Sequence, residues 1–194
     1  MYYRIFYLSL IFYFNYLLLS VKMEVQFLEK YLHKSMEIDA LLSSRPLIQE
    51  AEDPGEICEL FDIISSGKGA SIFRMLENTL GLRFKRGFQK YVKSHMYGGA
   101  VTEDLWSAIE SFTTEKIPVR DIMDTWTRQM GYPLLTVQQI DNVTYRVTQE
   151  RFLVDRNNLT AETEGSRWSI PVTWTCSIDK DHKMMEWIYQ ERFH

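Results

Sequence analysis

The spacing of apolar residues changes abruptly at Pro133, and this change constrains the fold more than any other feature of the sequence. Before Pro133, apolar side chains recur every three or four residues, which is the period of an amphipathic helix. After Pro133, apolar and polar residues alternate, which is the period of a half-buried strand. The clearest alternating run is Trp168, Ile170, Val172, Trp174 and Cys176. We therefore predict an α+β chain, in which helices precede three or four antiparallel strands within residues 134–178.

The part before Pro133 is predicted to contain one helix over residues 25–42 and five shorter helices after it. The strongest helix start lies at Asp53, because Pro54 follows at the first helical position and Glu56 completes a capping box. Gly67-Lys68-Gly69 is predicted to be a helix break that separates two amphipathic helices. The apolar stripes of the five shorter helices cover residues 57–64, 72–80, 84–92, 102–112 and 119–130.

The same glycine step does not form a phosphate-binding loop. Such a loop needs a strand, a glycine, four further residues, and then Gly-Lys followed by serine or threonine. Asp62 stands where the first glycine would be, Gly69 stands where the hydroxyl residue would be, and the preceding segment is helical. A phosphate site is therefore excluded here.

Charge and metal-ligand patterns exclude two further classes. The formal net charge is −4 and no basic stripe compensates for it, so nucleic acid is not an expected partner. The sequence has no His-Glu-x-x-His and no other histidine pair at helical spacing, so no zinc or other cofactor is expected in this chain itself. The four histidines are His33, His95, His182 and His194.

Cys58 and Cys176 are the two cysteines of the chain, and they lie far apart in the sequence. No CxxC motif is present, which argues against a structural zinc site. The two residues either form a disulfide in an oxidising compartment or remain as two buried thiols.

Residues 1–22 form a hydrophobic segment that differs in composition from everything after it. The run nearly suffices to span a bilayer, its tyrosines suit a membrane interface, and Arg4 and Lys22 flank it on both sides. Three origins are considered: a signal anchor, a cleaved signal peptide, or translated noncoding sequence. The first predicts a type II single-pass membrane protein with an extracellular or luminal domain. A clear small-x-small cleavage site is absent, which argues against the second.

Two glycosylation sequons occur in predicted turns of the β part. They are Asn142-Val143-Thr144 and Asn158-Leu159-Thr160. Because a glycan requires an exposed acceptor in a secreted or luminal chain, we expect at least one of the two asparagines to carry one if the chain is luminal.

Three segments together resemble the aminopeptidase N family of zinc metallopeptidases. They are DALLSSRPL at residues 39–47, ELFDIISSGKGASIFRML at residues 59–76 and VRDIMDTWTRQMGYPLLTV at residues 119–137. The run from Tyr91 to Ala100 and Asp104-Leu105-Trp106 agree with the same family in order and spacing. The resemblance covers residues 25–178.

The resemblance implies a fold and a chemistry. Residues 23–132 would be the helical, C-terminal part of a thermolysin-like catalytic domain, and residues 133–194 would be part of an antiparallel β-sandwich domain. In the family, zinc polarises the peptide carbonyl and activates water, a glutamate acts as base and a tyrosine hydroxyl supports the oxyanion. Peptides are the substrates, and homo- or hetero-oligomers with related aminopeptidases are possible partners.

This sequence departs from the family in two ways. It lacks the His-Glu-x-x-His helix and the Gly-x-Met-Glu-Asn loop that binds the substrate amino group. In addition, the family usually reads Ser-Tyr-x-Lys-Gly-Ala, and Ser66 stands at the tyrosine position. The loss of one oxyanion donor costs on the order of a hundredfold or more in rate. We expect a truncated aminopeptidase homologue that is inactive alone, or alternatively a membrane-tethered homologue that binds peptides or proteins without cleaving them.

Overall fold

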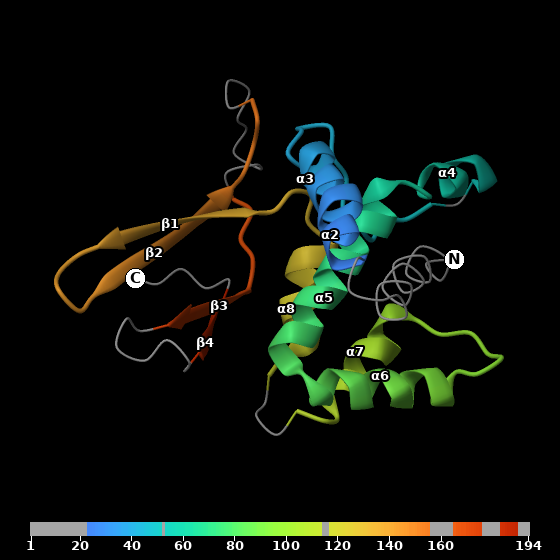
Figure 1. Ribbon diagram of the computed structural model, residues 1–194. Coiled ribbons are helices and arrows are strands. Elements are labelled where there is room, and N and C mark those ends of the chain that lie inside the picture. The colour runs from blue at the N-terminus through green and yellow to red at the C-terminus, as the bar shows by residue number, and fades with distance from the viewer. Residues whose placement is uncertain (1–22, 52, 114–116, 156–164, 176–182, 190–194) are drawn as a thin grey trace.

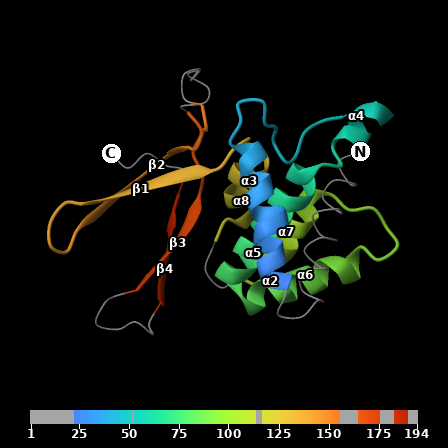
Figure 2. The ribbon, with the colours of Figure 1, turned by 45° about the horizontal axis from the view of Figure 1, so that its top comes forward.

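The computed structural model describes residues 23–51, 53–113, 117–155, 165–175 and 183–189. In this part of the chain the helices gather on one side and two antiparallel hairpins stand on the other (Figure 1). A second view, turned by 45°, keeps the hairpins to one side of the helices (Figure 2). The predicted α+β class is confirmed.

The first helical rod consists of three consecutive elements. These are α2 (Met23–Phe27), the π-helix η1 (Leu28–His33) and α3 (Lys34–Asp39). Phe27 and His33 at the two junctions keep right-handed helical dihedral angles, so the rod is continuous. It ends at Asp39, three residues before the predicted end at residue 42.

Gly67-Lys68-Gly69 does not interrupt the helical structure, so the predicted helix break is wrong. The helix that Asp53 caps, α4 (Pro54–Glu59), ends well before the step. The π-helix η2 (Ile64–Lys68) then continues directly into α5 (Gly69–Leu80), with helical dihedral angles at the junction. Gly67 is needed for another reason: a Cβ atom there would lie 2.7 Å from the Tyr31 carbonyl oxygen of η1. The glycine thus permits two helical backbones to approach closely.

We expect Gly67→Ala to destabilise the protein by about 1–3 kcal/mol, because the new methyl group overlaps backbone atoms that cannot move aside cheaply. Gly99→Ala is the matched control, since a Cβ atom at Gly99 meets nothing within 4 Å, and its effect should stay within about 0.5 kcal/mol. Urea unfolding followed by circular dichroism measures both. Equal stability of the two variants would show that the close approach does not need glycine.

Three further helices complete the helical core. They are α6 (Leu82–Ser94), α7 (Thr102–Glu110) and α8 (Val119–Thr127). Aromatic side chains fill the space between α5, α6 and α7: the Phe73 ring lies 6.2 Å from the Trp106 ring and 6.5 Å from the Phe84 ring. All three are almost fully buried; helical spacing predicts this for Phe84 and Trp106.

The described residues of the β part form two separate two-stranded antiparallel sheets, each a hairpin. Strand β1 (Pro133–Gln139) pairs antiparallel with β2 (Tyr145–Arg151), and β3 (Ile170–Thr175) pairs antiparallel with β4 (Lys183–Ile188). β1 begins at Pro133, where the spacing of apolar residues changes. The turn expected at Asp141 joins β1 to β2, and the Asp141 carboxylate accepts the backbone N–H groups of Val143 and Thr144. The fourth strand lies beyond the predicted limit at residue 178.

Residues 167–169, just before β3, are held by side chains of α8, of Gln129 just after it, and of β2. The Gln129 amide bonds both to the Arg167 carbonyl (2.7 Å) and to the Arg167 N–H (3.3 Å). The Gln149 amide bonds in the same two-sided way to Trp168, at 3.0 and 2.9 Å. The Thr125 hydroxyl accepts the Ser169 N–H at 3.1 Å, and the Trp126 indole N–H donates to the Ser169 carbonyl at 2.8 Å. Side chains thus replace a neighbouring strand and satisfy every backbone group of these three residues.

Gln149→Ala should lower the free energy of unfolding by about 1–3 kcal/mol, because it leaves the Trp168 N–H and carbonyl without their partners. Gln138→Ala changes an exposed glutamine of β1 and should remain within about 0.5 kcal/mol of the parent. Hydrogen exchange at Trp168 provides a local readout, and faster exchange in the Gln149 variant alone is the expected result. Unchanged protection would contradict the role given to Gln149.

Candidate functional site

Arg45 fixes the turn that leads into position 66. Its guanidinium group binds both carboxylate oxygens of Asp62, at 3.1 and 2.7 Å, and donates to the Ser65 hydroxyl at 2.8 Å. The Asp62 carboxylate also accepts the Ser65 N–H at 2.9 Å. A bidentate arginine–carboxylate pair has a defined geometry, so the start of η2 is held in one place by a residue about twenty positions upstream.

The Ser66 hydroxyl is turned back onto its own helix. It donates to the Asp62 carbonyl at 2.8 Å, which is the usual local bond of a serine inside a helix. A tyrosine at this position would carry its hydroxyl well beyond the helix surface. Ser66 therefore does not project its hydroxyl group from the helix surface.

Two residues after Ser66, Lys68 forms a buried ion pair with Asp39. The Nζ–Oδ2 distance is 2.7 Å, and the two side chains are only 7% and 3% exposed. Lys68 also donates to the Gly131 and Gln129 carbonyls, at 2.9 and 3.3 Å. Asp39 in turn accepts the Gly131 N–H at 2.8 Å and the Ser44 hydroxyl at 2.5 Å. Each charge thus has several partners, as a buried ion pair requires.

Burial controls the electrostatics of this cluster. Desolvation lowers the pKa of Lys68 below its usual value, Asp39 opposes that shift, and Arg151 and Arg45 add to it. Desolvation, reinforced by Asp39, raises the pKa of Tyr132. Desolvation also lowers the pKa of Arg151. The cluster thus joins one carboxylate to two buried cations, Lys68 and Arg151.

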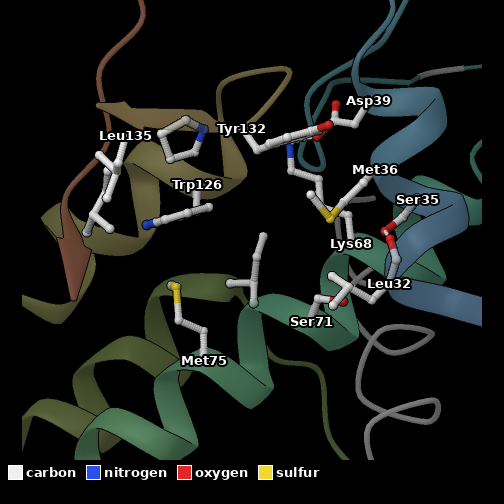
Figure 3. A pocket seen from close by; sticks show the side chains of 13 residues that line it. Leu32, Ser35, Met36, Asp39, Lys68, Ser71, Met75, Trp126, Tyr132 and Leu135 are labelled. Atoms are coloured by element: carbon white, nitrogen blue, oxygen red, sulfur yellow. Dashed lines mark hydrogen bonds and ion pairs between the residues drawn. The ribbon is translucent and has the colours of Figure 1, made fainter. Parts of the chain in front are cut away.

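A cavity of about 360 Å³ lies beside the ion pair. Figure 3 shows its wall built from three directions: Leu32 and Met36 from the first rod, Lys68 and Met75 from η2 and α5, and Trp126 from α8. Tyr132, Pro133, Leu135 and Ile170 close the side toward the strands. The cavity therefore lies where the helical part meets β1 and β3.

Sequence reasoning identified Ser66 but missed the ion pair and the cavity. Ser66 does not line the cavity. Asp39 and Lys68 are charged residues within otherwise apolar helix stripes, and this pattern indicates a buried charge. The pattern does not show which residue pairs with that charge. Of the two sequons, Asn142 lies exposed in the β1–β2 turn, and Asn158 lies outside the described residues.

The described residues do not offer a zinc site. No group of three or more His, Cys, Asp or Glu side chains among them could hold a metal ion. His33 is exposed on η1, and the Nδ1–H of His95 donates to the Tyr91 carbonyl oxygen at 3.0 Å. Cys58 is an exposed free thiol on α4, and Cys176 lies outside the described residues. The ligand set that the family needs is thus not supplied by this part of the chain.

None of the described helices combines the length and apolar character needed to cross a membrane. The hydrophobic segment of residues 1–22 lies outside the described residues.

Comparison with known proteins identifies the family. The Peptidase family M1 domain matches residues 7–126, which is more than half of the chain. The chain belongs to peptidase family M1. Because the match begins at residue 7, it includes most of the hydrophobic N-terminal segment. The family predicted from the three sequence motifs is thereby confirmed.

Similar M1 proteins come from animals and archaea. Glutamyl aminopeptidase of Bos taurus is 44% identical over 143 residues, and that of Homo sapiens is equally similar, with 72% of this chain covered in both cases. Tricorn protease-interacting factor F2 of Thermoplasma volcanium is 40% identical over 153 residues, or 78% of this chain. The chain spans only 14% of the length of the two glutamyl aminopeptidases and 18% of the archaeal protein.

Lys68→Met should destabilise the protein by about 3–5 kcal/mol, because it leaves the Asp39 carboxylate buried without its counter-charge. Arg128→Met is the control: Arg128 forms exposed ion pairs with Glu103 and Asp124, and their loss should cost less than about 1 kcal/mol. Chemical unfolding compares the two variants. Similar losses in both would contradict a central structural role for the buried pair.

Proposed function

We propose that this chain is part of a zinc aminopeptidase that removes N-terminal residues from peptides, and that the chain alone does not cleave them. Membership of family M1 and the names of the similar aminopeptidases support the reaction class. The sequence lacks His-Glu-x-x-His, and the described residues do not fit a zinc ion. In such enzymes a bound zinc ion supplies the Lewis acid and the activated water.

The geometry of position 66 supports the proposal that the chain alone does not cleave peptides. The Arg45–Asp62 pair holds the start of η2, and Gly67 seats η2 against the first rod. The site is therefore well ordered, but its side chain is a serine bonded to the Asp62 carbonyl. The oxyanion donor that the family takes from tyrosine is missing, while the scaffold that would present it is intact.

Ser66 also supports a second candidate, a homologue that binds peptides or a related aminopeptidase without cleaving them. In this case residues 1–22 would tether the chain as a type II membrane protein with an extracellular or luminal domain. The exposed position of Asn142 at the tip of the first hairpin suits a glycan in that compartment. The two candidates differ in whether a complete parent protein has activity.

A segment graft tests the role of position 66 in an active relative. Residues 59–76 of this chain replace the corresponding segment of bovine glutamyl aminopeptidase, once with Ser66 and once with Ser66→Tyr. We expect the Ser66 graft to lose about a hundredfold or more in kcat with a smaller change in KM, because a transition-state donor is absent. The Ser66→Tyr graft should recover most of the activity.

The matched pair of grafts separates the possible failures. An inactive Ser66→Tyr graft would show that the segment does not fit the catalytic domain of the relative. An active Ser66 graft would show that the serine causes no loss. In parallel, the full 194-residue chain should cleave neither glutamyl nor alanyl anilides, and chelator-sensitive cleavage by the purified chain would overturn its proposed inactivity.

A further inference from the structure

We propose that the cavity beside the Asp39–Lys68 pair is a binding site for a small, uncharged and largely aromatic or aliphatic molecule. This site is separate from position 66, because Ser66 does not line it.

The wall of the cavity is predominantly apolar. Its apolar side chains include Leu32, Met36, Met75, Trp126, Leu135 and Ile170. Two of these are methionines, whose flexible thioether side chains adapt to ligands of different shape and contact aromatic rings favourably. Trp126 is held in place because its indole N–H donates to the Ser169 carbonyl at 2.8 Å. A ligand would thus meet one fixed aromatic face and two adaptable walls.

Three polar side chains in the wall, those of Ser35, Ser71 and Lys68, already have hydrogen-bond partners. The Ser35 hydroxyl donates to the Leu32 carbonyl at 2.8 Å, and the Ser71 hydroxyl donates to the Gly67 carbonyl at 2.7 Å. Lys68 directs its ammonium group to Asp39 and to two backbone carbonyls. A polar ligand would find no free donor among these three groups.

This arrangement selects against a charged ligand. An anion would have to displace Asp39 from Lys68, and a cation would have to displace Lys68 from Asp39. Either exchange leaves a charge buried without its partner, which is costly. An uncharged molecule disturbs neither side of the pair and gains free energy from the apolar area that it covers.

The size of the cavity sets the size of the ligand. An apolar cavity of about 150 Å³ stays dry and holds one benzene molecule, and this one is about 360 Å³. A two-ring aromatic compound is therefore a suitable probe. Because Trp126 belongs to α8 while Leu135 and Ile170 belong to β1 and β3, a bound molecule would bridge the helical part and both hairpins.

Three probes with the same two-ring body test the proposal at pH 7 on the full 194-residue chain. They are 2-naphthol, the anion 2-naphthoate and the cation 2-naphthylmethylammonium, and binding is measured by isothermal titration calorimetry and by thermal unfolding. We expect 2-naphthol to bind with a dissociation constant of about 1 mM or tighter and to raise the unfolding temperature. The two ions should bind at least about tenfold more weakly.

Cavity-filling variants locate the binding site. Met36→Trp and Leu135→Trp place bulk into the cavity from opposite sides, and each should abolish 2-naphthol binding. Met184→Trp is the matched control, because Met184 lies exposed on β4 and lines no part of the cavity, and it should bind as the parent does. Circular dichroism verifies that each variant is folded, and the two fillers serve as alternatives if one of them is not.

Two results would overturn the proposal. One is the absence of 2-naphthol binding to the folded parent chain, or binding that persists in both cavity-filling variants. The other is binding of 2-naphthoate as tight as that of 2-naphthol, which would show that the excess positive charge of Lys68 and Arg151 recruits anions. The two grafts differ only at position 66, which does not line the cavity, so their comparison tests the proposed function whatever the result here.

Discussion

The buried pair of Asp39 and Lys68 brings together segments that are distant in the sequence. Asp39 is the last residue of the first rod and Lys68 is the last residue of η2. Lys68 donates to the Gly131 carbonyl, and the Asp39 carboxylate accepts the Gly131 N–H. A buried charge is tolerated only when its hydrogen-bonding capacity is met, so the chain at Gly131 must lie at one place between them. Gly131 has a φ angle of 82°, which glycine adopts without strain. Strand β1 begins two residues later, and its starting point is thereby fixed to the helices.

The joint between the helical part and the hairpins follows from this anchor. β2 returns antiparallel to β1 and brings Gln149 beside residues 167–169, while Gln129, two residues after the end of α8, binds the same segment. These hydrogen bonds are made to the backbone groups of residues 167–169 and not to their side chains. The cavity is enclosed where the same elements meet, next to the ion pair. The junction of the helices and hairpins thus contains the Asp39–Lys68 ion pair, the hydrogen bonds of Gln129 and Gln149, and the cavity.

The contacts that fix η2 around position 66 do not involve the side chain of residue 66. The Arg45–Asp62 pair and the close packing at Gly67 involve neighbours of residue 66 but not its side chain. A different side chain at this position therefore leaves the contacts that hold the helix unchanged. The family is accordingly recognisable from the residues that surround position 66.

The sequence by itself determined the secondary-structure periods, the helix start at Asp53 and the family, because each is encoded in local spacing or in a local motif. It did not determine the purpose of Gly67, for which local pattern suggested a helix break. The tertiary structure decided that purpose, since the carbonyl oxygen that excludes a Cβ atom belongs to Tyr31, more than thirty residues away in the chain. It likewise decided that Asp39 and Lys68 pair and that Gln129 and Gln149 hold residues 167–169. Periodicity reports which side chains are buried, whereas the partner of a buried charge or amide depends on how distant segments pack.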